Sequence, residues 1–338
     1  MGSGGMATVH LARLAGAAGF TRTVAIKRMH PHLARDPQFV GMFTDEAKLA
    51  ARIQHPNVVQ TLDVVSFQDE LFVVLEYVHG VSLSQLIRQA RANDGGIPVG
   101  VALRVGVDVL HGLHAAHEAR SERGEPLELV HRDVSPQNVI VGTDGTARVL
   151  DFGVAKALGR MQASTEGQIK GKVAYVSPEQ LRGERVSRTS DIYSAGVMLW
   201  EVLAGRQLFQ GATEATVLMA ILEGKIPSLR SYCPDVPPLL EATLGRALSS
   251  NPSMRFATAA EMADALERSA PMASAREVGA WAEIVATKSL EKRAALLARV
   301  ESSPCNVSLA NVVELELTPG GGIRSCRRRR SPSPTASR

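Results

Sequence analysis

HRDVSPQN, at residues 131–138, and DFG, at residues 151–153, are the two segments that decide the fold of this 338-residue chain. Transfer of a phosphoryl group requires a carboxylate that orients the attacking hydroxyl and oxygen ligands that bind Mg²⁺. Asp133 can supply the carboxylate, and Asn138 and Asp151 can supply the oxygen ligands. Two such motifs at this spacing are a specific signal, and they predict a phosphoryl-transfer site.

The residues between the two motifs predict a β-hairpin. Residues 139–141 and 147–150 are predicted to be two short strands, and the turn-forming sequence GTDG at residues 142–145 joins them. Such a hairpin would bring Asn138 and Asp151 together.

Upstream, a glycine-rich segment and a lysine add to this site. Residues 2–9 read GSGGMATV, and glycine lets backbone amides approach phosphate groups closely. Lys27 ends the strand-like run VAIK, and we expect Glu46, on a helix at residues 37–53, to hold its ammonium group in place. Taken singly, these features are also compatible with a flexible N-terminal tail and with solvated surface charges.

The order of elements predicts an α+β protein with two lobes. The first seventy or so residues show strand patterns around residues 9–12, 23–27 and 71–75, interrupted by the helix at 37–53. The later sequence is mainly helical, with candidate helices at residues 82–91, 100–119, 190–204, 213–222, 236–248 and 258–268.

With these motifs in place, the sequence resembles the protein kinase family from Gly2 to about residue 268. The exact residues of its glycine-rich segment and of HRDVSPQN most resemble those of bacterial Ser/Thr kinases. SPE at residues 177–179 is similar to the family's Ala-Pro-Glu element. Asp191 resembles the aspartate that braces the catalytic loop, and Arg255 resembles the arginine that pairs with the Glu179 position.

The resemblance implies a function and a set of roles. A kinase of this type transfers the γ-phosphate of ATP, with Mg²⁺, to hydroxyls of protein substrates. Lys27 would hold the phosphates, Glu46 would orient Lys27, and Asp133 would orient the substrate hydroxyl. The implied nucleotide- and metal-binding residues are Gly2, Gly4, Val9, Ala25, Lys27, Glu76, Val78, Asn138 and Asp151, with Asn138 and Asp151 as metal ligands.

We expect a protein kinase domain at residues 1–268, with a small β-rich N-lobe at 1–77 and a larger helical C-lobe at 78–268. The first strand is expected to be incomplete, because the glycine-rich segment begins at residue 2. An amphipathic helical extension is predicted over 269–318, and a disordered tail rich in Arg, Ser and Pro over 319–338.

Two residues depart from the family pattern together. Ser/Thr kinases usually carry lysine two positions after the catalytic aspartate, and here Ser135 stands there. They carry threonine before the Ala-Pro-Glu element, where this chain has Lys172 after a glycine. We hypothesise that the two have been exchanged, so that Lys172 supplies the ammonium near the γ-phosphate. The alternative is that Lys172 faces solvent and the enzyme is slow or inactive.

The segment between the two motifs DFG and SPE is the predicted activation segment. It contains Thr165 and Ser164, which we expect to be autophosphorylated in that order of preference. Arg132 precedes the catalytic aspartate and would pair with such a phosphate.

Charge and composition indicate which classes of partner to expect: nucleic acid, membrane or metal. Six arginines lie in the last fifteen residues, and removing them from the net charge of +4 leaves −2 for the rest, so a nucleic-acid surface is expected at most in the tail. No membrane span is predicted.

The three cysteines lack metal-ligand spacing and indicate a reducing cytoplasm. His111, His114 and His117 invite a metal site, but a structural or solvated role is the expectation.

Two other functional classes remain open. A pseudokinase that binds nucleotide or partners as a scaffold is favoured by the short N-terminus, Ala7 in place of a third glycine, and Ser135. A small-molecule kinase is disfavoured by SPE and by the long activation segment, which build a platform for a protein substrate.

Overall fold

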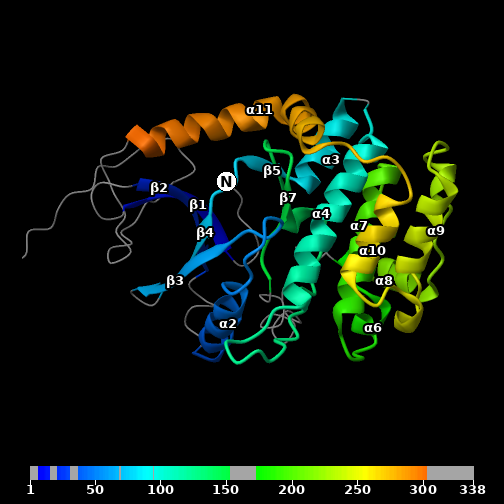
Figure 1. Ribbon diagram of the computed structural model, residues 1–338, viewed down its shortest axis with the longest axis horizontal. Helices are drawn as coiled ribbons and strands as arrows, with labels where there is room; N and C mark the ends of the chain where they lie inside the picture. The colour runs from blue at the N-terminus through cyan, green and yellow to red at the C-terminus, as the bar shows by residue number, and fades with distance from the viewer. Residues whose placement is uncertain are drawn as a thin grey trace, which may run out of the picture.

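The computed structural model describes residues 7–15, 21–30, 37–67, 70–93, 95–152 and 173–302. Figure 1 shows a β-sheet with one helix on one side of the molecule and a larger group of helices on the other. The predicted α+β architecture with two lobes is confirmed.

The N-lobe sheet is antiparallel and has the strand order β1-β2-β4-β3. The strands are β1 (Ala7–Ala15), β2 (Thr21–Met29), β3 (Thr61–Phe67) and β4 (Glu70–Glu76). Helix α2 (Pro37–Ala50) packs against this sheet. Sequence patterns located β1, β2, β4 and α2 but assigned no separate strand to residues 61–67.

The alternation of side chains along β2 decides where Lys27 points. Val24 and Ile26 are buried on one face with apolar residues of the neighbouring strands. Met29 is buried on the opposite face beside Phe43 of α2. Because successive side chains of a strand point to opposite faces, Lys27 shares the face of Met29 and therefore projects toward α2 and the gap between the lobes.

A second, three-stranded sheet joins the lobes. It comprises β5 (Gly80–Ser82), β6 (Val139–Gly142) and β7 (Ala147–Val149) in that order. The hairpin of β6 and β7 confirms the prediction for the residues between the two motifs, and Leu150 N donates to Asn138 O at 2.8 Å.

The helical lobe is built around two buried helices, α4 (Val99–His117) and α7 (Arg188–Ala204). The side chains of α7 are buried continuously from Ser190 to Leu203, and Gly205 ends the helix with a φ of 63°, which glycine adopts without strain. Around these two helices lie α3 (Leu83–Ala92), α6 (Pro178–Leu181), α8 (Glu214–Glu223), α9 (Pro238–Ala247) and α10 (Ala259–Glu267).

Single 3₁₀ turns connect several of these elements, at Pro136–Asn138, Val173–Tyr175, Leu229–Ser231 and Pro252–Met254. The last described element is α11 (Ala275–Ser302), a long helix with a kink at Ala286. It falls within the predicted helical extension, and Figure 1 shows it running from the helical lobe across to the N-lobe sheet.

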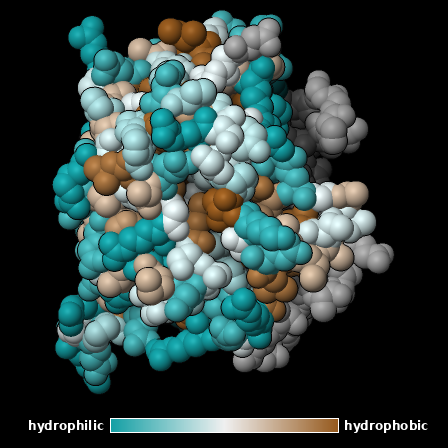
Figure 2. Space-filling model, turned by 90° about the vertical axis from the view of Figure 1, so that its right-hand side faces the viewer, coloured by the Kyte–Doolittle hydropathy of each residue, from teal (hydrophilic) through white to brown (hydrophobic). Residues whose placement is uncertain are grey.

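One helix and one face of the surface bear on whether this chain contacts a membrane or another protein. Within the described residues, α4 has the length and apolar composition of a membrane-spanning helix, but 67% of that stretch is buried in the core of this lobe. Figure 2, which views the molecule from its right-hand side in Figure 1, shows apolar residues as separate spots among hydrophilic ones. Scattered exposed apolar side chains are normal for a folded domain.

Candidate active site

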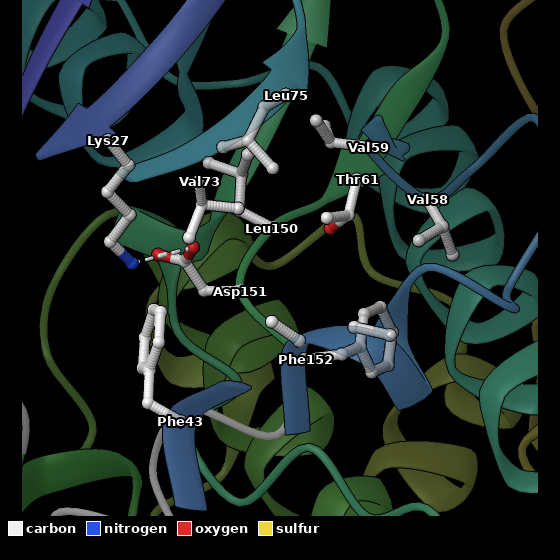
Figure 3. Close-up of a pocket in the computed structure, with 12 residues that line it drawn as sticks. Lys27, Phe43, Val58, Val59, Thr61, Val73, Leu75, Leu150, Asp151 and Phe152 are labelled. Atoms are coloured by element: carbon white, nitrogen blue, oxygen red, sulfur yellow. Dashed lines mark ion pairs between the residues drawn. The ribbon is translucent and has the colours of Figure 1, made fainter. Parts of the chain in front are cut away.

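The gap between the lobes contains an ion pair between Lys27 and Asp151. Lys27 projects from β2, Asp151 follows β7, and their Nζ and Oδ1 atoms lie 2.8 Å apart (Figure 3). Asp151 has a φ of 60°, a conformation that is uncommon for a residue other than glycine. The next residue, Phe152, is buried with its ring edge-on to His131, with the ring centroids 4.7 Å apart. This anchor holds the backbone that carries Asp151.

Asp133 and Asn138 are joined directly. Asn138 Nδ2 donates to Asp133 O at 2.7 Å and to Asp133 Oδ2 at 2.8 Å. The hydrogen bond from Leu150 N to Asn138 O places Asn138 beside the residue that precedes Asp151. The structure therefore brings together the three residues that the two motifs singled out.

His131 links the catalytic loop, which carries Asp133, to Leu150, the residue before Asp151. Its Nε2 donates to Leu150 O at 2.7 Å, and its Nδ1 accepts from Asp133 N at 3.2 Å. This pattern assigns the proton to Nε2, because a carbonyl oxygen can only accept. The sequence motif includes His131, but its link between the catalytic loop and the DFG segment follows only from the fold.

Asp191 braces the catalytic loop from the start of α7. Its Oδ2 accepts from His131 N and its Oδ1 from Arg132 N, both at 2.8 Å. His117 Nε2 lies 2.8 Å from Oδ2. Arg132 has a φ of 67°, so these bonds hold the backbone in a conformation that it would not otherwise favour.

The pKa of Asp191 reflects these contacts. Complete burial raises it, but the hydrogen bond and charge of His117, with further help from His131 and the Arg132 amide, outweigh burial and lower it overall. The bond to Asp191 gives His117 a structural role, one of the two that the sequence left open. Among the described residues, no group of three or more His, Cys, Asp and Glu side chains could hold a metal ion.

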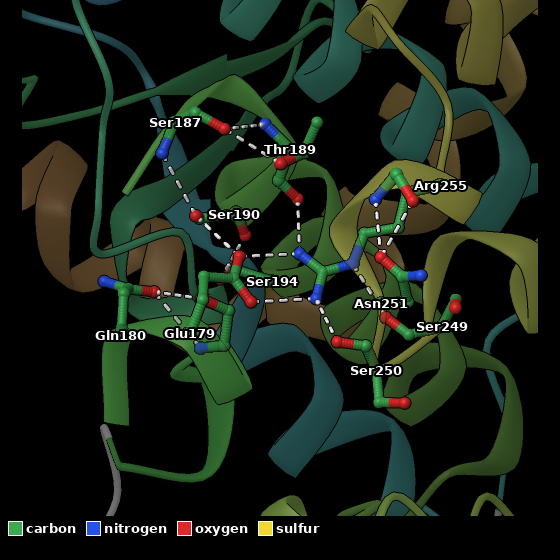
Figure 4. Close-up of polar contacts among 12 residues, drawn as sticks. Glu179, Gln180, Ser187, Thr189, Ser190, Ser194, Ser249, Ser250, Asn251 and Arg255 are labelled. Atoms are coloured by element: carbon green, nitrogen blue, oxygen red, sulfur yellow. Dashed lines mark hydrogen bonds and ion pairs between the residues drawn. The ribbon is translucent and has the colours of Figure 1, made fainter. Parts of the chain in front are cut away.

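A buried ion pair ties the SPE element to Arg255, which follows the 3₁₀ turn Pro252–Met254 (Figure 4). Arg255 NH1 and NH2 donate to Glu179 Oε1 and Oε2 at 2.7 and 2.8 Å, and Ser190 Oγ donates to Oε1 at 2.7 Å. Burial raises the pKa of Glu179, but the hydrogen bonds from Arg255 and Ser190 outweigh it and lower the pKa to about 2. The predicted pairing of Glu179 with Arg255 is confirmed.

Comparison with known proteins decides the family. Residues 1–265 match the family described as protein kinase domain. The chain belongs to the protein kinase family.

Curated kinases share much of this sequence. The tyrosine-protein kinase MasK of Myxococcus xanthus is 44% identical over 267 residues, which cover 79% of this chain and 41% of MasK. The serine/threonine-protein kinase PrkC of Bacillus subtilis is 33% identical over 262 residues, covering 78% of this chain and 38% of PrkC. This kinase chain thus spans roughly two fifths of the length of these relatives.

A solved structure gives the same result. The crystal structure of the Mycobacterium tuberculosis PknI kinase domain is 28% identical to this kinase, with a TM-score of 0.59. The match covers 80% of this chain and 92% of that one.

The donor chemistry of this kinase fits the Mg²⁺ that its family implies. Both hydrogens of the Asn138 amide nitrogen are used by Asp133, so the carboxamide oxygen is the atom left to act as a ligand. A carboxamide oxygen and the Asp151 carboxylate are hard oxygen donors of the kind Mg²⁺ prefers.

Three of the predicted nucleotide-binding residues, Val9, Ala25 and Glu76, lie on adjoining strands. Val9 of β1 pairs with Lys27, and Ala25 pairs with Leu75 at the end of β4. Beyond Leu75, Glu76 is fixed by two bonds to Gln60, because its backbone N–H donates to Gln60 O and its Oε1 accepts from Gln60 N, both at 3.0 Å. This bonding sets where the hinge, residues 76–78, leaves the N-lobe.

Behind Leu75 the interior of the N-lobe is nearly full. The space lined by Phe43, Leu75 and Phe152 has a volume of about 20 Å³, room for one water molecule (Figure 3). The space behind Leu75 therefore has no room for an adenine ring in this conformation.

Several predicted residues lie outside what the structure describes: Gly2, Gly4, Ser164, Thr165 and Lys172, together with the side chain of Glu46. The exchange of Ser135 with Lys172 therefore stays a prediction. Ser135 itself is fully buried, and its hydroxyl has no hydrogen-bond partner among the described residues.

Proposed function

We propose that this chain is a Ser/Thr protein kinase that transfers the γ-phosphate of Mg-ATP to hydroxyl groups of protein substrates. The observation that carries the proposal is the convergence of Asp133, Asn138 and Asp151, with Lys27 against Asp151. Similarity to bacterial serine/threonine-protein kinases at about one third identity supports it.

Each side chain has a role that its position allows. Asp133 accepts the proton of the substrate hydroxyl and orients it, and the bonds from Asn138 keep that carboxylate in one place. Lys27 carries its positive charge to the phosphates, while Asn138 and Asp151 would hold the metal. Bound Mg²⁺ neutralises charge on the phosphate oxygens. Asp191 keeps the loop rigid, so little reorganisation accompanies the reaction.

The test is transfer of radiolabel from Mg-[γ-³²P]ATP to casein and myelin basic protein, with the variant Asp133→Asn beside the wild type. We expect label that requires Asp133 and that phosphoamino-acid analysis finds on serine and threonine. Equal labelling, or equal lack of it, in the two proteins would contradict the proposal and favour the scaffold function.

A tyrosine kinase is the second candidate, and two observations favour it. MasK is named a tyrosine-protein kinase and shares 44% identity with this chain. Ser135 also replaces the lysine that Ser/Thr kinases usually carry at this position. The same phosphoamino-acid analysis separates the candidates, because label confined to phosphotyrosine would overturn the Ser/Thr assignment.

We propose autophosphorylation in the activation segment as part of this function, at Thr165 first and Ser164 second. The support is their location between the DFG and SPE elements and the presence of Arg132 beside the catalytic aspartate. Mass spectrometry after incubation with Mg-ATP tests this. A catalytically active protein that remains unmodified at both residues would contradict it.

A further inference from the structure

Helix α11 packs closely against the helical lobe at its first end. Gly279 lies so near Thr143 that an added Cβ would come within 2.4 Å of the Thr143 carbonyl oxygen. Gly145, with a φ of 78°, lies so near Ala275 that an added Cβ would overlap the Ala275 carbonyl oxygen. Val278, Ala282 and Ala286 of α11 are buried in the hydrophobic core of this lobe. These approaches fix the direction in which α11 leaves the lobe.

Farther along, α11 is bonded to α3. Gln85 Nε2 and Gln89 Nε2 both donate to Ser289 Oγ, at 2.6 and 2.8 Å. Gln85 and Gln89 are one helical turn apart, so they present two amides on one face of α3. This double contact places the next turn of α11 beside β5 and the hinge.

Arg293, one turn beyond Ser289, extends into that region. Its NH1 donates to the carbonyl oxygen of Gly80, the first residue of β5 and two residues past the hinge. Burial lowers the pKa of Arg293, and the nearby Tyr77 of the hinge opposes that change. Among the described residues, no carboxylate forms an ion pair with Arg293. Arg293 is half-buried, and a guanidinium that loses part of its hydration without a carboxylate partner must be satisfied by other polar groups, here those of the hinge segment.

The other end of α11 reaches the N-lobe. Arg13 of β1 donates from NH1 to the backbone oxygen of Glu301 at 2.7 Å, and from NH2 to Thr21 Oγ1 at 3.0 Å. Glu301 lies in the last turn of α11, where carbonyl oxygens lack intrahelical donors and a cation is favourable. Helix α11 thus contacts both lobes, with Arg293 between the two attachments.

We propose that Arg293 is a positioning residue for the hinge and, resting on the proposed function, that it sets the site where adenine binds. By fixing the Gly80 carbonyl and lying beside Tyr77, Arg293 restricts the backbone of residues 76–80. That backbone carries the Glu76 and Val78 groups expected to face adenine. The C-terminal extension is thereby part of the nucleotide site without touching the nucleotide.

The experiment compares Arg293→Met, Arg293→Lys and Lys292→Ala in the full chain. Methionine keeps the apolar stem of arginine but cannot donate a hydrogen bond, and lysine keeps the charge and a single donor nitrogen. Lys292 is an exposed cation on the same helix and serves as the control. Hydrogen–deuterium exchange of the peptide covering residues 76–82 reports hinge mobility directly. Steady-state kinetics report KM for ATP and kcat separately.

We expect Arg293→Met to speed exchange in residues 76–82 and to raise KM for ATP about three- to tenfold, with kcat within about twofold. Arg293→Lys should recover part of both effects, and Lys292→Ala neither. Exchange and KM in Arg293→Met equal to those of Lys292→Ala would overturn the inference.

The two proposals fail differently. If the wild type binds no Mg-ATP while Arg293→Met still speeds hinge exchange, the proposed function is overturned and the positioning of the hinge is supported. If the wild type binds Mg-ATP and Arg293→Met leaves exchange unchanged, the inference about Arg293 is overturned alone.

Discussion

The polar groups of the helical lobe and those in the gap between the lobes are held in different ways. Asp191 is fully buried and accepts from two backbone amides and His117, and the Glu179–Arg255 pair is 2% and 0% exposed. Lys27 and Asp151 share one ion pair, with 13% and 29% of their side chains exposed. The first group forms permanent scaffolding. If the proposed function holds, we expect the second group to exchange partners when nucleotide binds.

The largest effect on stability is expected where the scaffold is broken. Arg255→Met leaves the Glu179 carboxylate buried without its guanidinium, and removal of one partner of a buried pair costs about 3–5 kcal/mol. Urea unfolding of the variant and of the wild type measures this. A loss below about 1 kcal/mol would show that the pair contributes no more than a surface ion pair does.

Acid should weaken the same pair. The pKa of Glu179 is about 2 in the folded chain against an ordinary value of 4.5. A depressed folded pKa contributes stability that is complete above about pH 4.5 and is lost as the pH falls toward 2. The contribution is on the order of 3 kcal/mol.

Urea unfolding of wild type and Glu179→Gln from pH 7 to pH 2.5 tests this. We expect the difference in unfolding free energy between the two proteins to shrink steadily below pH 4.5. A difference that stays constant over this range would refute the assignment.

Asp191→Asn should have a smaller effect on stability. The amide keeps one acceptor oxygen but turns an NH₂ group toward a backbone N–H or toward His117, so one buried donor loses its partner. We expect a loss of about 1–3 kcal/mol. The strained backbone at Arg132 should also relax, with reduced kcat, and unfolding and kinetic measurements on one preparation check both effects.

The smallest effect on stability belongs to Lys27→Met. An ion pair that is partly exposed contributes at most about 1 kcal/mol. The same change should reduce turnover by about 10²–10³, since it removes a charge that faces the phosphates. Matching losses of stability and activity would instead place Lys27 in the scaffold.

The sequence predicted the parts of this molecule that local signals specify. The motifs at residues 131–138 and 151–153 located the site, and amphipathic periodicity located the main helices. Strand β5 was not predicted, because its three residues form a strand only by pairing with β6, which lies about sixty residues away in the sequence. Strand β3 is only half-buried, so its apolar alternation is weak.

The contacts that the sequence did not predict are tertiary. The ion pair of Lys27 with Asp151 forms because the β6–β7 hairpin delivers Asp151 from more than a hundred residues away. The pairing of Lys27 with Glu46 stays a prediction, because the Glu46 side chain lies outside the described residues. The bond of His117 to Asp191 depends on the packing of α4 on α7. Arg293 lies in a helix whose register against the hinge is set by close approaches at Gly279 and Gly145.

The most direct test is the rise in thermal midpoint on adding Mg-ATP, measured for the wild type and for Asp151→Asn. A ligand that binds only the folded chain raises its midpoint. We expect both proteins to unfold at nearly the same temperature without nucleotide, a clear rise for the wild type with Mg-ATP, and little or none for Asp151→Asn. Equal rises in the two proteins would contradict the assignment of Asp151 to the Mg-ATP site.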